Sequence, residues 1–183
     1  MRKRVLILTA AVLLALVLAV PASASKPTKV SGGFIADWGT LTDEEVPVGN
    51  RCFVNVWYNA SLDGAIAASC AVHEWQVAHG PCDEEIAPGV YEHIYPGKYR
   101  ETLHVEADCS DATLGGKSGT FQLRGNGEMV PVDPPTPFVF YWREDCVIQS
   151  GTGDLANLHG SLTLESLPVQ AGTYSGEIHF DPN

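Results

Sequence analysis

Short segments in which apolar and polar residues alternate strictly, separated by glycine and proline, constrain the fold of this chain more than any other feature. In the segment 52–59 the even-numbered residues share one face and the odd-numbered residues the other, as in a strand with one buried face. Asp63 and Gly64 then form a strong hairpin signal, and the segment 65–77 resumes the alternation. Beyond the N-terminal segment, no apolar period of 3.6 residues is sustained, so the sequence predicts strands and little helix.

The sequence predicts eight strands of this kind. They span residues 30–40, 52–59, 65–77, 100–108, 117–123, 138–148, 158–167 and 173–180. Closure into a cylinder gives every strand two neighbours and leaves no edge unpaired. We therefore predict an all-β fold, a closed or nearly closed eight-stranded antiparallel barrel with little helix.

The N-terminal residues 1–24 have the organisation of a secretory signal peptide. Arg2, Lys3 and Arg4 precede an apolar run over residues 5–20, and the small residues 22–24 follow it. The run is shorter than the roughly 20 residues that a membrane-spanning helix needs. This favours a cleaved signal peptide over the alternative, a retained membrane anchor, and we expect cleavage before residue 25 and secretion to the extracellular space.

Removal of the signal peptide would leave a strongly acidic chain, residues 25–183, which we predict to form a single domain. Of 11 Lys or Arg residues three lie in the signal peptide, so eight would remain against 22 Asp or Glu, a net charge of −14. Such a surface disfavours nucleic acid and anionic lipid as partners. We expect a soluble protein without membrane association, and the sequence leaves open whether it is a monomer or a homo-oligomer.

Five cysteines would enter an oxidising compartment, where paired thiols form disulfides. Their spacing includes no C-x2-C pair, which argues against a structural zinc site. We predict that Cys82 pairs with Cys109, across the least regular stretch, and Cys52 with Cys70 across a hairpin. The count is odd, and the unpaired thiol has three interpretations: a buried apolar side chain, a link between protomers or a nucleophile.

The alternation breaks over residues 79–98, an acidic segment punctuated by proline and glycine. A connection of this length is unusual in a compact domain and often carries function. We predict that it forms a loop that acts as a lid.

Three segments of the second half resemble a known family: 114–121 (LGGKSGTF), 150–160 (SGTGDLANLHG) and 172–181 (GTYSGEIHFD). Over about residues 60–181 the chain resembles uncharacterised bacterial members of the allene oxide cyclase-like barrel superfamily. The resemblance implies an eight-stranded calycin-type barrel. The plant cyclases of this superfamily close a ring in a fatty-acid-derived epoxide, but their site residues have no identifiable counterparts in this chain, so architecture alone is implied.

The segment 150–160 also has a structural interpretation that needs no ligand. Gly151 and Gly153 permit positive φ in a turn, and Asp154 is placed to cap a short helical turn over residues 155–158. We therefore interpret this segment as a device of the fold.

Aromatic residues on the predicted strands are candidates for a ligand site. We predict that Trp57, Trp75, Tyr141 and Trp142 line the interior and bind a small apolar or amphipathic ligand. His104 is a fifth candidate, because its strand face meets either water or a cavity. Eight strands enclose a packed core or one small ligand, so the alternative is that the aromatic side chains fill or seal the barrel.

Chemical motifs give no firmer assignment. His104 and Glu106 share a strand face, but a third metal ligand would have to come from elsewhere, such as His93. The chain has no G-x-S-x-G, P-loop or G-x-G-x-x-G motif. We predict no metal and no cofactor, the sequence identifies no catalytic residue, and we favour a ligand-binding barrel. The alternatives are a secreted structural or interaction module and an isomerase or cyclase-like enzyme.

Overall fold

The computed structural model describes residues 26–78, 84–87, 90–92, 101–131, 140–167 and 171–182. The predicted signal peptide lies outside these residues. Within them the chain forms strands and no helix. The strands are β1 (Thr28–Val48), β2 (Arg51–Leu62), β3 (Ile66–Ala78), β4 (Glu84–Ala87), β5 (Val90–Glu92), β6 (Glu101–Leu114), β7 (Lys117–Pro131), β8 (Phe140–Gly153), β9 (Leu158–Ser166) and β10 (Ala171–Phe180).

No helix that is long and apolar enough to cross a membrane occurs in the described part of the chain.

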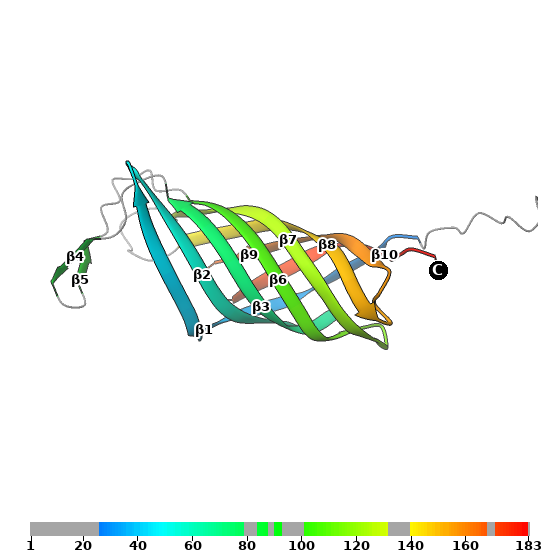
Figure 1. Cartoon of the computed structure of the whole chain (residues 1–183). Coiled ribbons are helices and arrows are strands. Elements are labelled where there is room, and N and C mark those ends of the chain that lie inside the picture. Colours follow the sequence, from blue (N-terminus) through cyan, green and yellow to red (C-terminus); the bar gives the residue numbers. More distant parts are fainter. Residues whose placement is uncertain are drawn as a thin grey trace, which may run out of the picture.

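Eight strands form a closed antiparallel barrel in the order β1-β10-β9-β8-β7-β6-β3-β2 (Figure 1). Neighbours in the ring are consecutive along the chain, apart from β4 and β5 between β3 and β6 and the closing pair β1 and β10. The predicted eight-stranded antiparallel barrel is confirmed. The segment 79–98, predicted as a loop, contains β4 and β5, which pair with each other as a separate sheet; its other residues, and the predicted lid, lie outside the described part.

The predicted alternation decides which side chains enter the barrel. On β3 the even-numbered residues from Ile66 to Glu74 are buried, while Ser69 and Ala71 between them are exposed. On β6 the odd-numbered residues from Leu103 to Cys109 are buried in the same alternating way. The buried faces of the eight strands meet in one hydrophobic cluster along the barrel axis.

The connections divide the barrel into two ends. The β2–β3, β6–β7 and β8–β9 turns share one end, here called the turn end, and the β1–β2 turn lies at the other, the loop end. At the turn end the Tyr174 hydroxyl accepts a hydrogen bond from the Ile66 amide (2.7 Å) and donates one to its carbonyl oxygen (3.0 Å). Ile66, Leu155 and Leu158, at the same end, are fully buried.

The prediction for Asp154 is wrong in detail. Residues 154–157 form turns and no helix, because only four residues separate β8 from β9. The carboxylate of Asp154 instead accepts a hydrogen bond from the amide of Ser118 (3.4 Å), and its own amide donates to the Ser118 carbonyl oxygen (2.9 Å). Gly153 has a φ of +62°, as its place in the turn predicts.

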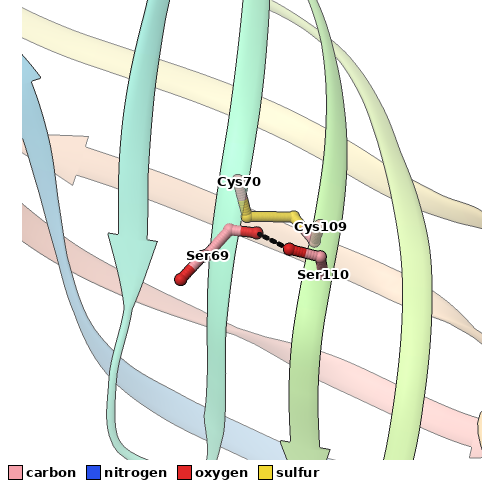
Figure 2. Close-up of a disulfide and its surroundings, with 4 residues drawn as sticks. All are labelled: Ser69, Cys70, Cys109 and Ser110. Carbon is pink, nitrogen blue, oxygen red and sulfur yellow. Dashed lines mark hydrogen bonds between the residues drawn. A yellow bond between two sulfur atoms is a disulfide. The ribbon is translucent and has the colours of Figure 1, made fainter. Parts of the chain in front are cut away.

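A disulfide joins Cys70 on β3 to Cys109 on β6 (Figure 2). The two residues lie directly opposite each other in the β3–β6 register. Beside them the Ser110 hydroxyl donates a hydrogen bond of 3.4 Å to the carbonyl oxygen of Ser69, as Figure 2 shows. The bridge spans 39 residues of sequence and ties together two strands that are not consecutive in the chain.

Both predicted disulfide pairings, Cys82 with Cys109 and Cys52 with Cys70, are therefore wrong, because Cys70 and Cys109 are bonded to each other. The β2–β3 register gives the physical reason for the second error: Cys70 pairs with Ala60, and Cys52 lies farther along the hairpin toward the loop end. Cys52 is itself disulfide-bonded. Cys82 lies outside the described residues.

Candidate functional site

A cavity of about 40 Å³ lies inside the barrel. Its walls are apolar over most of their area and include Phe34, Val72, Leu123 and the small side chain of Ala107. The Glu144 carboxyl lies at the same cavity and is its one acidic lining residue. A site of this size has room for about three water molecules or a group of similar volume.

Two glycines on β7 make room for the polar side chains of β8. Gly125 pairs with Cys146 and Gly127 with Glu144, all on the inner face of the barrel. A Cβ on Gly125 would lie 2.5 Å from Sγ of Cys146, and one on Gly127 would lie 2.6 Å from Cγ of Glu144. The interior volume that β7 leaves free is therefore occupied by the thiol and the carboxyl.

Glu74 on β3 is a second buried acid, with 3% of its surface exposed. Both of its oxygens accept hydrogen bonds: Oε2 from the Tyr58 hydroxyl (3.0 Å) and Oε1 from Nε2 of Gln76 (2.8 Å). Tyr58 comes from β2 and also lines the cavity. The ring of Trp38, which is half exposed, stacks on Tyr58 with a centroid separation of 6.5 Å, so this hydrogen-bonded group adjoins the barrel surface.

Glu144 is as deeply buried, at 2% exposed, but it is poorly hydrogen-bonded. Its Oε2 is 3.9 Å from the Cys146 thiol, a weak donor. No described residue donates a hydrogen bond to Oε1 of Glu144. A buried carboxyl oxygen without a donor is costly to a folded protein, so it marks a position where a further donor would stabilise the site.

Burial raises the pKa of both acids, and it does so more strongly for Glu144. The negative charge of Glu74 adds to the effect of burial on the Glu144 pKa. The hydrogen bonds from Gln76 and Tyr58 lower the pKa of Glu74 and so partly offset the increase caused by burial. The two acids titrate as a coupled pair.

The neighbouring Tyr58 and Cys146 stay neutral. Burial and the charge of Glu74 raise the pKa of Tyr58 well above its usual value, so its hydroxyl remains a donor. Burial, followed by the charge of Glu144, raises the pKa of the Cys146 thiol. Cys146 is the free cysteine among the described residues, and it is buried. Of the three interpretations of the unpaired thiol, the structure supports the buried side chain, since a reactive cysteine needs exposure and a lowered pKa.

The five aromatic and histidine candidates fall on two sides of the barrel wall. Trp142 lines the cavity, with its ring 5.2 Å from that of Phe34. Tyr141 faces outward one position away, and its hydroxyl donates to Oε1 of Glu165 (3.0 Å). Trp57 and Trp75 also lie on the outer face, so their predicted place on the interior wall is corrected.

Strand parity explains the correction. The inward residues of β2 and β3 have even numbers, whereas Trp57 and Trp75 have odd numbers. With His73 they form an outer row of rings, in which centroids are 4.6 Å apart for Trp57 and His73 and 3.8 Å apart for His73 and Trp75. His104 continues the row at 5.3 Å from Trp75, and its Nδ1 lies 2.8 Å from the side-chain oxygen of Asn126.

The sequence contains a signal for the interior acids that belongs to no catalytic motif. Glu74 continues the apolar face of β3 that begins at Ile66, and Glu144 lies between Trp142 and Cys146 on the inner face of β8. A carboxyl at a core position of an alternating strand is rare and therefore informative. Within the described residues no group of three or more His, Cys, Asp or Glu side chains is arranged to hold a metal ion.

Fold and site together define a small antiparallel β-barrel with an acidic interior site. No protein-family model matches the chain, and no curated protein matches it. Among solved structures the chain is similar to the crystal structure of a protein of unknown function from the DUF3224 family of Shewanella oneidensis MR-1. The match covers 86% of this chain and 100% of that chain, with a TM-score of 0.56 and 17% sequence identity. At this identity the similarity establishes a shared all-β fold.

Proposed function

We propose that this protein is secreted and binds a small amphipathic molecule inside its barrel. One observation carries the proposal: an apolar cavity adjoins a buried carboxyl, Glu144, whose Oε1 accepts no hydrogen bond from a described residue. Ligand sites typically combine mainly apolar walls with a few convergent polar groups. The disulfide between Cys70 and Cys109 is of the kind found in oxidising compartments, which supports secretion.

The cavity sets the size of the ligand. Sites for drug-sized molecules enclose roughly 300–1,000 Å³, whereas this one is about 40 Å³. It fits a molecule, or one end of a molecule, of about three or four non-hydrogen atoms. Even an optimal ligand of that size gains at most about 1.5 kcal/mol per atom, so we expect affinities of micromolar or weaker.

The test is an NMR titration of the mature protein with propan-1-ol and propylamine, which share one carbon skeleton. Binding inside the barrel shifts the amide signals of Val72 and Leu123, which line the cavity. The variant A107V adds two methyl groups to the cavity wall and should abolish these shifts. A matched control is A71V, at an exposed outward position of β3, which should leave them unchanged. If neither propan-1-ol nor propylamine shifts the interior amide signals, the proposal is overturned.

A second candidate, an interaction module that binds carbohydrate, is favoured by the outer face. An open groove of about 480 Å³ lies over β1, β2, β3 and β6. Trp57 and His73 of the ring row lie two residues along β2 and β3 from its lining residues Asn59 and Ala71. Asp37, Asn59, Ser61 and Asp108 are among the residues that line the groove. Sugars present apolar faces to aromatic rings and hydroxyl edges to carboxylate, amide and hydroxyl groups, and this face offers both.

Co-sedimentation with insoluble polysaccharides tests the second candidate. The variant W57A should lower the bound fraction, because Trp57 is the exposed ring that opens the row. The control V147A removes an exposed apolar side chain from β8, away from the groove, and should bind like the wild type. Equal binding by W57A and V147A, or no binding by the wild type, would rule out this candidate.

A further inference from the structure

Resting on the proposed interior site, we propose that its ligand is a small primary amine, bound as an ammonium ion by Glu144 and Tyr58 with its carbon chain in the apolar cavity. The chemical class of the ligand follows from the charges of the interior acids, the hydrogen-bond acceptors that they and Tyr58 leave free, and the apolar walls of the cavity.

The acidic side chains of the interior site favour a cationic ligand. Glu74 and Glu144 are buried in one apolar interior, and each raises the electrostatic cost of ionising the other. In the described part of the chain, the arginine ion pairs are on the outside of the barrel: Arg124 with Glu106, and Arg143 with Asp145 and Glu165. None of the described Lys or Arg side chains reaches the two interior acids.

The free acceptors match an ammonium group. An ammonium carries three N–H donors and no acceptor. Glu144 lines the cavity, and its Oε1 accepts no hydrogen bond from a described residue. Tyr58 lines the same cavity, and its hydroxyl, which donates to Glu74, can still accept a hydrogen bond. An ammonium donating to Glu144 and to Tyr58 would be coupled through Tyr58 to the charge of Glu74.

The walls suit the rest of the ligand. The rings of Tyr58 and Trp142 line the cavity beside Glu144 and favour a nearby cation through their negative faces. Beyond them the cavity is bounded by Val72, Leu123 and other apolar side chains, which suit a short alkyl chain. A carboxylate ligand would be repelled by both acids. An alcohol of the same shape would bind without compensating their charge.

Binding of the amine is coupled to the release of a proton from Glu144. Burial and the charge of Glu74 raise the pKa of Glu144, which favours a proton on Glu144 in the free site. The arriving ammonium keeps its three protons, and Glu144 loses its proton to solvent. The ammonium then contacts the Glu144 carboxylate and is coupled to the charge of Glu74 through Tyr58. Tyr58 and Cys146, the other titratable groups facing Glu144, stay neutral because burial raises both pKa values. One proton is therefore released for each amine bound, and affinity for the amine rises with pH.

The experiment titrates propylamine against propan-1-ol, from about pH 5 to about pH 8, with the amide signals of Val72 and Leu123 as readout. At the upper pH we expect propylamine to bind at least about tenfold tighter than propan-1-ol, because a charge-assisted hydrogen bond is stronger than a neutral one. Calorimetry in two buffers of different ionisation enthalpy should show release of about one proton per amine. Affinity for propan-1-ol should not change with pH.

Two variants locate the effect. E144Q should lose the preference for the amine and still bind propan-1-ol, because the amide preserves the shape and removes the charge. D145N removes a carboxylate from the neighbouring outward position of β8 and should keep the preference. If E144Q fails to fold, E74Q removes the charge of the other interior acid and should likewise weaken the preference for the amine.

The outcomes separate the two proposals. Equal affinities for amine and alcohol in the wild type overturn the assignment of the amine and leave the interior site standing. A preference that persists in folded E144Q and E74Q also overturns it. If neither probe shifts the interior signals, the proposed function fails and the amine assignment fails with it.

Discussion

The side chain of Glu144 occupies the interior space that Gly127 leaves free on the neighbouring strand. A Cβ at Gly127 would lie 2.6 Å from Cγ of Glu144 and 2.2 Å from the carbonyl oxygen of Arg143. The position on β7 therefore has to be glycine for the carboxyl on β8 to lie inside the barrel. The acid at the centre of the site and the glycine opposite it are one structural unit.

Replacement of this glycine tests the unit directly. G127A should lower the free energy of unfolding by about 1–3 kcal/mol, because the added methyl group meets backbone that must shift. Urea denaturation measures the change. The control G39A adds a methyl group whose nearest neighbour is an exposed side-chain oxygen of Asp37 at 3.1 Å, and it should change stability by less than about 0.5 kcal/mol. Equal effects of the two variants would contradict the account.

The stability of the fold should depend on pH through the interior acids. A glutamate with a higher pKa in the folded state binds its proton more tightly there. Its contribution is complete below the unfolded pKa of about 4.3 and is lost as pH rises through the raised folded pKa. E144Q cannot ionise at this position. The free energy of unfolding of E144Q, minus that of the wild type, should therefore grow from about pH 5 to about pH 8. Parallel pH profiles for the two proteins would contradict a raised pKa at Glu144.

The disulfide should contribute substantially to stability. It closes a loop with a sequence separation of 39 between β3 and β6. In the chain-entropy model a loop of that size is worth about 4 kcal/mol, and the double variant C70A/C109A should lose about 3–4 kcal/mol. Thermal or urea unfolding measures the loss. A loss below about 1 kcal/mol would mean that the β3–β6 register holds without the bridge.

Cys146 should resist thiol reagents in the folded protein. It is 2% exposed, and burial together with the charge of Glu144 raises its pKa, which suppresses the reactive thiolate. Alkylation followed by peptide mass spectrometry should find Cys146 unmodified under native conditions and modified in urea. Rapid native modification would show that the interior opens to reagents of that size.

Much of the fold follows from parity and turn chemistry. Alternation correctly grouped the residues of β2 into two faces, and Asp63-Gly64 correctly marked the β2–β3 turn. The extent of β7 was underestimated, because Gly125 and Gly127 resemble turn residues when their neighbours in space are unknown. In the barrel they lie inside a strand, since Cys146 and Glu144 take up the space of the missing side chains.

The site was less predictable, because it depends on strand order and register. Aromatic character suggested Trp57 and Trp75 as wall residues. Their parity is opposite to that of the inward residues Tyr58 on β2 and Glu74 on β3, so they lie outside. The disulfide between Cys70 and Cys109 depends on β3 pairing with β6, and no local pattern specifies that neighbour. Contacts between distant strands decide both features.

The central claim, that the barrel holds a small molecule beside Glu144, is tested most directly by a crystal structure of the mature protein soaked in propylamine at about pH 8. The account predicts density for the amine in the cavity, with its nitrogen within hydrogen-bond distance of Oε1 of Glu144 and its carbon chain against Leu123. A cavity that contains only ordered water, or that is closed by the surrounding side chains with the amine confined to the surface, would contradict it.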